Sequence, residues 1–237
     1  MKYKAVLFDV DDTLCKTAGT KGYVFDQLYR NHKIFHSVPI EKFRKILTES
    51  REKYFNKLIS KGFNTYARIE FWFEIMKNLK IVVPVVELSE IVTEYWELTY
   101  EHVVPYPGLQ EMLEELRKLD GIIIATLTAG DYYSKTEKLM KLGIEKYFDY
   151  NFVTELVQKP KTTGHIYQYV LDYLNLEPKE VLMVGDKPHE DIIPANKIGI
   201  DTVQVTIRGD FEVAAKGHAK PDFVTDNLKE LIQIINN

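Results

Sequence analysis

The sequence predicts an α/β protein in which a doubly wound parallel sheet carries an inserted α-helical bundle. Short apolar runs recur along the chain, and the later runs alternate with segments of helical periodicity. Continuous apolar runs of this kind are typical of parallel strands that helices cover on both faces. Residues 17–104 break the alternation with long helical segments, which indicates a second folding unit.

Five apolar runs are expected to form strands of the sheet. They are AVLF at 5–8, IIIA at 122–125, FV at 152–153, VLMV at 181–184 and TVQV at 202–205. Apolar residues at helical spacing between the later runs predict the covering helices, as at Leu109, Met112, Leu113, Leu116 and Leu119. The stretch PDFVTDNLKELIQII near the end predicts one more short strand and a closing helix.

Residues 17–104 are expected to form a helical cap domain, inserted after the first strand. Its helices are expected at roughly 21–36, 40–61, 66–80 and 87–101, between which prolines stand near the breaks. A core of its own would come from bulky side chains, namely Phe71, Trp72, Phe73, Tyr95 and Trp96. Pro105, Pro107 and Gly108 suit a stiff return to the sheet, so residues 1–16 and 105–237 form the sheet domain.

The composition argues against several classes of protein. Lys and Arg number 31 against 35 Asp and Glu, and the mixed signs lack the basic clusters that bind nucleic acid. The single cysteine, Cys15, cannot form an internal disulfide. Too few apolar residues precede Asp9 for a signal peptide, and no apolar run has membrane length. We therefore expect a cytoplasmic protein that binds neither membrane nor nucleic acid, as a monomer or a homodimer.

Charged and polar residues are concentrated where the expected strands end. Asp9 and Asp11 follow the first strand within the sequence DVDDT. Further candidates follow the later strands: Thr128, Lys159, Asp186 and Asp191. Because open parallel sheets bind ligands beyond the carboxyl ends of their strands, we expect these residues on one edge. Clustered carboxylates need a cation, and oxygen ligands suit Mg²⁺, which often shares its coordination shell with a phosphate.

These motifs resemble those of the haloacid dehalogenase-like hydrolase superfamily, most of whose members are phosphatases. DVDDT at 9–13 matches the first motif, Asp-x-Asp-x-Thr. The other three motifs resemble LTAG with Thr128, QKPKTTGHIY with Lys159, and GDKPHED with Asp186 and Asp191. The chain has Ala129 where the family frequently has Asn. The resemblance spans the sheet domain, about two-thirds of the chain, and makes this domain the Rossmann-like catalytic core.

The resemblance and the residue chemistry together imply a magnesium-dependent phosphohydrolase that acts on a small phosphorylated metabolite. Asp9 would be the nucleophile that forms an aspartyl-phosphate, and Asp11 the general acid and base. Mg²⁺ would be bound by the side chains of Asp9 and Asp186 and by the backbone carbonyl of Asp11. Asp191 would orient that coordination shell. Thr128 and Lys159 would bind the phosphoryl oxygens.

Three other functions stay open at this point. A 2-haloacid dehalogenase uses the same aspartate to displace halide from carbon, but it needs neither magnesium nor a second acid, so Asp11 favours phosphate. A phosphomutase would return the phosphoryl group to another hydroxyl, and its cap would have to exclude water. A non-catalytic binding protein on the same fold has no reason to tolerate the repulsion among Asp9, Asp11 and Asp186.

Overall fold

The structure is a computed structural model that describes residues 2–17, 20–60 and 68–236. It divides into two compact units, one of Met1–Lys16 and Val104–Asn237 and the other of Thr17–Val103. The division lies one residue before the expected one, because Val104 pairs with Lys16. This pair belongs to a small antiparallel ladder of β2 (Cys15–Lys16) and β3 (Val104–Pro105). None of the helices in the described ranges is both long and apolar enough to cross a membrane.

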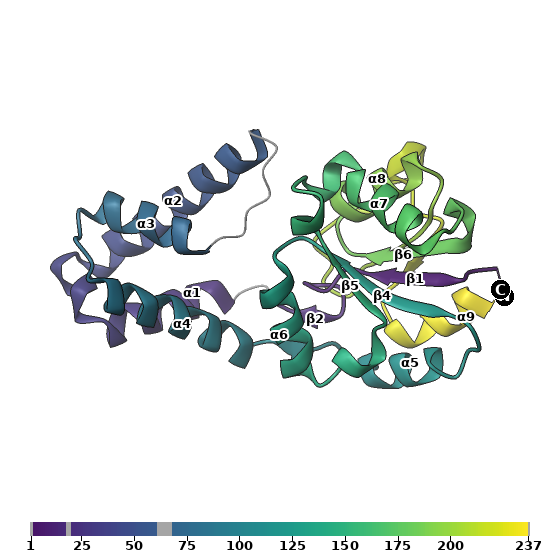
Figure 1. Cartoon of the computed structure of the whole chain (residues 1–237), viewed down its shortest axis with the longest axis horizontal. Coiled ribbons are helices and arrows are strands. Elements are labelled where there is room, and N and C mark those ends of the chain that lie inside the picture. Colours follow the sequence, from purple (N-terminus) through teal and green to yellow (C-terminus); the bar gives the residue numbers. More distant parts are fainter. Residues whose placement is uncertain (1, 18–19, 61–67, 237) are drawn as a thin grey trace. The chain divides into compact units, whose positions relative to one another are not determined.

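A six-stranded sheet forms the centre of the first unit, with the strand order β5-β4-β1-β6-β7-β8 (Figure 1). The strands are β1 (Ala5–Phe8), β4 (Ile123–Thr128), β5 (Tyr150–Val153), β6 (Val181–Gly185), β7 (Asp201–Val205) and β8 (Phe223–Thr225). Every pairing in this sheet is parallel. The predicted α/β class with a parallel sheet is therefore confirmed. Each apolar run named in the sequence overlaps one of these strands, and only the run at 122–125 begins outside its strand, by one residue.

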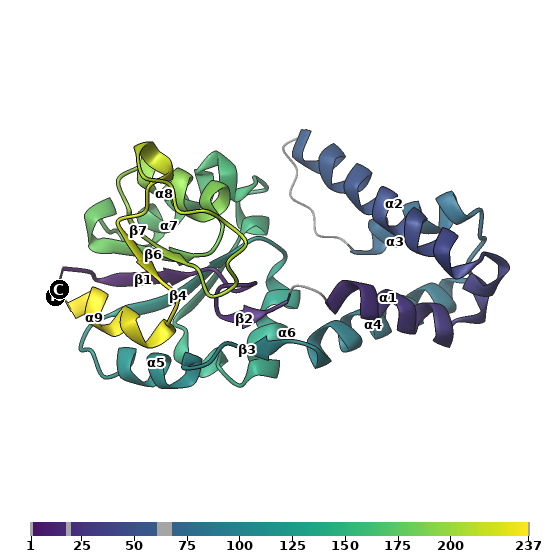
Figure 2. The ribbon, with the colours of Figure 1, turned by 180° about the vertical axis from the view of Figure 1, so that it is seen from behind.

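Helices cover both faces of the sheet, as the continuous apolar runs predict. They are α5 (Leu109–Leu116), α6 (Tyr132–Leu142), α7 (His165–Leu174), α8 (Ile193–Lys197) and α9 (Leu231–Asn236). The helices α7 and α8 lie on one face, and α5 and α9 lie on the other (Figures 1 and 2). Ile166 and Val170 of α7 share a buried cluster with Leu7 of β1 and Ala125 of β4. All four residues of β1 are buried, so this strand is the centre of the core.

The path of the chain places the site. It leaves β1 for β4 and β5 on one side, and then crosses to β6, β7 and β8 on the other. The connections therefore diverge at β1, and the crevice beyond the carboxyl end of this strand is where such sheets bind ligands. Asp9 is the first residue after β1.

The second unit is helical and has a core of its own. Its helices are α1 (Thr20–Asn31), α2 (Ile40–Ser60), α3 (Arg68–Leu79) and α4 (Val85–Glu101). Leu28, Phe43, Trp72 and Ile91 bring one buried side chain from each of these helices into a single cluster. The expected helix ends at residues 61 and 66 lie outside the described residues. That this unit acts as a cap domain stays a prediction.

Two expectations for this unit were wrong in detail. The helix expected over 21–36 ends at Asn31, and a 3₁₀ turn over Lys33–Ser37 follows it. His32 between them has an extended backbone, with φ −108° and ψ 104°, and the turn buries Phe35 in the core. Phe73, expected in the core, is 58% exposed, whereas its neighbour Trp72 is fully buried.

This contrast gives a test of how α3 packs. Trp72→Ala is expected to lower the free energy of unfolding of the helical unit by about 3–5 kcal/mol, because it leaves a large cavity. Phe73→Ala, the matched control, is expected to change it by less than about 0.5 kcal/mol. Urea denaturation followed by far-UV circular dichroism measures both. Equal losses in the two variants would show that α3 packs with another face.

Candidate active site

Asp9 is held by backbone contacts at the carboxyl end of β1. Its amide donates to the carbonyl of Val184 in β6 at 2.9 Å. The chain then turns back sharply: Asp12 adopts a left-handed backbone with φ 67°, and its amide donates to the carbonyl of Cys15 at 2.8 Å. Arg208 Nη1 donates to Asp12 Oδ2 at 2.6 Å, which steadies this turn. The loop therefore fixes the backbone from which the side chains of residues 9 and 11 project.

Three of the predicted site residues come together at this edge. Asp9, Asp186 and Asp191 each offer a carboxylate oxygen, and these oxygens lie within 4.8 Å of one another. All three side chains are buried. Gly185 makes this packing possible, because a Cβ at that position would lie 2.3 Å from Cγ of Asp191. Asp191 itself sits in a π-helical turn over Pro188–Ile192, a rare form that is frequent at functional sites.

The lysine that reaches these carboxylates is Lys161, whereas the residue chosen from the sequence is Lys159. Nζ of Lys161 donates to Asp9 Oδ1 and to the carbonyl of Leu127, both at 3.0 Å, and also to Asp191 Oδ1. The side chain of Lys161 is fully buried, whereas Lys159 is exposed.

The backbone between the two lysines explains the difference. Gln158 has a left-handed backbone with φ 50°, and Pro160 leads into a 3₁₀ turn over Lys161–Thr163. The fixed φ of proline favours entry into such a turn. The turn directs Lys161 under the ends of the strands and leaves Lys159 in solvent.

The pKa values of the buried group reflect both burial and the charges of its neighbours. Burial, together with the adjacent Asp9, raises the pKa of Asp186 to about 8. Burial alone would lower the pKa of Lys161, but Asp191 and Asp9 outweigh it and hold the pKa well above its usual value. Lys187 is a second cation that acts on this group. Burial would lower the pKa of Lys187, but neighbouring carboxylates, among them Asp9 and Asp186, outweigh it and raise this pKa.

One oxygen of Asp186 is available for a ligand. Oδ1 accepts a hydrogen bond from Thr13 Oγ1 at 3.3 Å, a hydroxyl that also lies 3.4 Å from Asp9 Oδ2. Within the described ranges, Oδ2 of Asp186 is buried without a hydrogen-bond partner. Buried polar atoms almost always have one, so this oxygen calls for a cation or a water. The all-oxygen donor set fits a hard divalent cation.

Asp11 faces two lysines that the sequence reasoning missed. Its two carboxylate oxygens accept hydrogen bonds from Lys135 and Lys138 of α6. Burial alone would raise the pKa of Asp11, but the two ammonium groups outweigh it and hold this pKa well below its usual value. The carboxylate of Asp11 is therefore ionised. A metal contact through its backbone carbonyl stays a prediction.

A capping signal could have revealed these lysines. Asp131 Oδ1 accepts from the amide of Ser134 at 2.8 Å, which begins α6 at Tyr132 and sets its phase. Lys135 and Lys138, three residues apart, then lie on the buried face. Thr128, the remaining candidate, is buried as the last residue of β4, beside β1.

The sequence is similar to that of a known protein family. Residues 3–199 match a family model described as haloacid dehalogenase-like hydrolase. The chain belongs to this family. The predicted resemblance and the prediction of a hydrolase are thereby confirmed.

Two solved structures and one curated relative illustrate the family likeness. The glyceraldehyde 3-phosphate phosphatase of Methanocaldococcus jannaschii is 27% identical over 99% of this chain and 97% of its own. The 2-haloacid dehalogenase of Pseudomonas syringae has a TM-score of 0.73 at 22% identity, over 99% of this chain and 98% of its own. The HAD-hydrolase YfnB of Bacillus subtilis, bound to magnesium, has a TM-score of 0.71 at 18% identity over the whole of both chains. At these identities the two solved structures bear on the fold alone.

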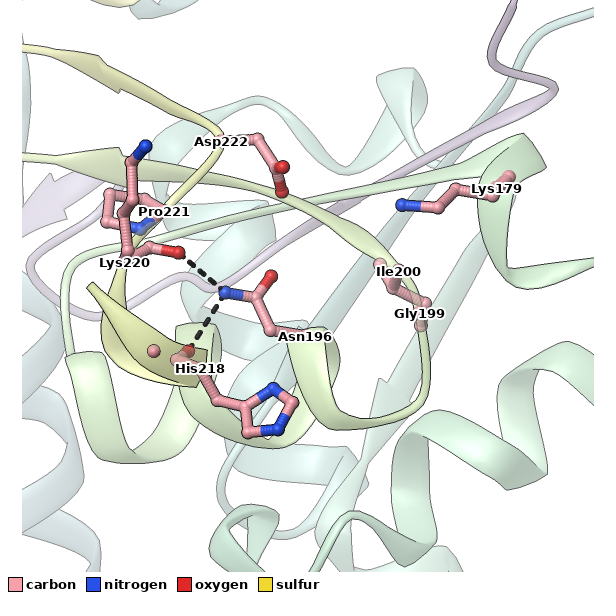
Figure 3. A pocket seen from close by; sticks show the side chains of 9 residues that line it. Lys179, Asn196, Gly199, Ile200, His218, Lys220, Pro221 and Asp222 are labelled. Atoms are coloured by element: carbon pink, nitrogen blue, oxygen red, sulfur yellow. Dashed lines mark hydrogen bonds between the residues drawn. The ribbon is translucent and has the colours of Figure 1, made fainter. Parts of the chain in front are cut away.

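This hydrolase also has a pocket at the opposite edge of the sheet. Its volume is about 370 Å³, and it lies beside the amino ends of β7 and β8 (Figure 3). The amide of Asn196 closes one side by donating to the carbonyls of His218 and Lys220, at 2.9 and 2.8 Å. None of the predicted site residues lines it.

The raised pKa of Asp186 predicts how stability depends on pH in metal-free protein. The pKa of Asp186 is about 4 in the unfolded chain and about 8 in the folded protein. The stability that its protonation contributes is therefore complete below pH 4 and is lost as the pH rises to 8. In EDTA, Asp186→Asn should raise the thermal midpoint by several degrees at pH 8.5 and by much less at pH 5. Asp226→Asn, an exposed control, should change neither midpoint. A gain that is the same at both pH values would contradict the assignment.

Proposed function

We propose that this hydrolase is a magnesium-dependent phosphatase that transfers a phosphoryl group from a small phosphate ester to Asp9 and then to water. The observation that carries the proposal is the buried group of Asp9, Asp186 and Asp191, in which Oδ2 of Asp186 has no hydrogen-bond partner. The phosphatase relative from Methanocaldococcus jannaschii, similar over nearly the whole chain, supports the same reaction class.

The residues of the chain would perform two displacement steps at phosphorus. In the first, Asp11 has left the two lysines and taken up a proton. An oxygen of Asp9 forms a bond to phosphorus while the bond to the leaving oxygen breaks, and Asp11 gives that oxygen its proton. In the second, Asp11 takes a proton from a water molecule that attacks the phosphorus of the aspartyl-phosphate. The P–O bond to Asp9 breaks, inorganic phosphate leaves, and both carboxyl groups return to their starting states.

The bound magnesium would neutralise charge between the carboxylate of Asp9 and the phosphoryl oxygens, so that one anion can approach another. The side chains of Asp9 and Asp186 and the backbone carbonyl of Asp11 would hold it. Asp191 would orient this group, because Lys161 and the amide of Lys187, at 2.9 Å, already occupy its two oxygens.

Lys161 replaces Lys159 in the proposed phosphate site. Its ammonium lies 3.0 Å from Asp9 Oδ1, so it would reach a phosphoryl oxygen on that carboxylate. Thr128, at the end of β4, would bind a second phosphoryl oxygen from the neighbouring strand. Both residues are buried in the sheet unit, which favours a site that is formed before the substrate arrives.

The dehalogenase alternative has less support than phosphate transfer. The similarity to a 2-haloacid dehalogenase, at 22% identity, concerns the fold alone. Displacement of halide from carbon uses one carboxylate and requires no cation. The buried carboxylate of Asp186 and the second acid, Asp11, would have no purpose in that reaction.

Replacement of the nucleophile tests the reaction class. Asp9→Asn is expected to lower magnesium-dependent release of phosphate from glyceraldehyde 3-phosphate or p-nitrophenyl phosphate by about 10⁴-fold or more. EDTA should abolish the activity of the unchanged protein, and added Mg²⁺ should restore it. Release of chloride from 2-chloropropionate is the parallel assay. Chloride release in EDTA, without phosphate release in Mg²⁺, would establish the dehalogenase instead.

The two lysines around Pro160 give a matched pair of variants. Lys161→Met should reduce kcat/KM for phosphate release by about 100-fold or more, since it removes a buried donor to the phosphoryl group. Lys159→Met should leave kcat/KM within about twofold, because an exposed charge contributes little. Circular dichroism controls for folding. The reverse order of effects would restore Lys159 as the phosphate-binding residue.

A further inference from the structure

Lys135 and Lys138 bring two positive charges to a single carboxylate. One ammonium donates to each oxygen of Asp11. The lysine side chains are 10% and 8% exposed, and that of Asp11 is 24% exposed. Asp11 thus lies in a largely buried site that two ammonium groups of α6 form. The proposed reaction needs the same carboxylate, so its place at these lysines calls for an explanation.

The path of Lys135 connects the pair to the proposed phosphate site. Gly130, two residues after Thr128, has φ 148°, and a Cβ there would lie 2.7 Å from Cε of Lys135. The lysine stem thus runs across the backbone of the loop that Thr128 begins. The negative charge of Asp9 also acts on Lys135. Lys135 therefore links Asp11 with the loop that follows Thr128.

The role proposed for Asp11 conflicts with these contacts. As general acid and base, its carboxylate must face the oxygen that leaves phosphorus at Asp9. In the structure both of its oxygens are engaged by the lysines. When Asp11 turns toward the ester, the two largely buried ammonium groups lose this carboxylate. Loss of a counter-ion from a buried charge is costly, so another anion at this place would favour the working arrangement.

We propose that Lys135 and Lys138 form a subsite for a carboxylate group on the substrate, and that Asp11 occupies this subsite until substrate binds. The proposal rests on the phosphatase function proposed above and names its substrate class: small phosphate esters that also carry a carboxylate. A carboxylate is the expected occupant because the lysine pair already binds one in the same planar, two-oxygen form. Substrate binding and the release of Asp11 are thereby coupled.

A matched pair of substrates tests the subsite. The esters 3-phosphoglycerate and glycerol 3-phosphate have the same carbon skeleton. The first carries a carboxylate at the position where the second carries a hydroxymethyl group. In Mg²⁺, kcat/KM is expected to be about tenfold or more higher for 3-phosphoglycerate, the factor that one charge-assisted hydrogen bond supplies. Phosphate release measures both, with p-nitrophenyl phosphate as a general substrate.

Variants on α6 assign the preference to the two lysines. Lys135→Met and Lys138→Met should each reduce the ratio of the two kcat/KM values by about tenfold. Lys141→Met is the matched control, because Lys141 is exposed on the same helix, and it should keep the ratio. The ratio is the informative quantity, since loss of a contact to Asp11 would lower turnover of both esters together.

The outcomes separate this inference from the proposed function. A ratio near one in the unchanged protein, or a ratio that both lysine variants retain, would overturn the subsite and leave the lysines as a structural clamp on Asp11. If the variants fail to fold, the ratio in the unchanged protein still decides. Failure to hydrolyse all three esters would instead remove the phosphatase function, and the subsite with it.

Discussion

The rest of the site depends on the ion pairs of Lys161. Its buried ammonium bonds to Asp9 and Asp191 and so allows two carboxylates to lie side by side away from water. A third, Asp186, completes the group. It forms no ion pair within the described part of the chain, but the charge of Lys187 acts on it. Burial of such charge is tolerable only when partners compensate it. The pKa of Asp186 is raised by burial and by Asp9 even though the charge of Lys187 opposes this, so a divalent cation would add to the compensation at this carboxylate.

The sheet explains how residues so distant in sequence reach this ammonium. Because β1 lies between β4 and β6, the loops that follow these strands open onto one crevice. Asp9, Thr128 and Asp186 each stand at the carboxyl end of one of the three strands. Lys161 and Asp191 enter from short turns, where an unusual backbone and a glycine, Gly185, make room for them. Asp11, in the loop after β1, instead accepts hydrogen bonds from Lys135 and Lys138. The proposed chemistry requires it to exchange these partners for the substrate.

Much of the fold and part of the site could be predicted from the sequence. The strands follow directly from continuous apolar runs, since burial on both faces leaves little freedom in residue type. The choice between Lys159 and Lys161 could not be made in the same way, because the left-handed Gln158 and the turn after Pro160 decide which lysine faces inward. Lys135 and Lys138 were missed because the helical spacing of apolar residues was used to find the buried face of each helix. On α6 the inward face carries lysines, while Tyr132 and Tyr133 are exposed.

The central claim is that the carboxylates of Asp9 and Asp186 converge on one divalent cation. Manganese is a suitable probe, since it accepts the same oxygen ligands as magnesium and scatters X-rays anomalously. In crystals of the protein soaked with Mn²⁺, we expect one strong anomalous peak at about 2.0–2.3 Å from an oxygen of each of these two aspartates. A peak bound elsewhere, with the carboxylates of Asp9 and Asp186 still without metal, would contradict the account.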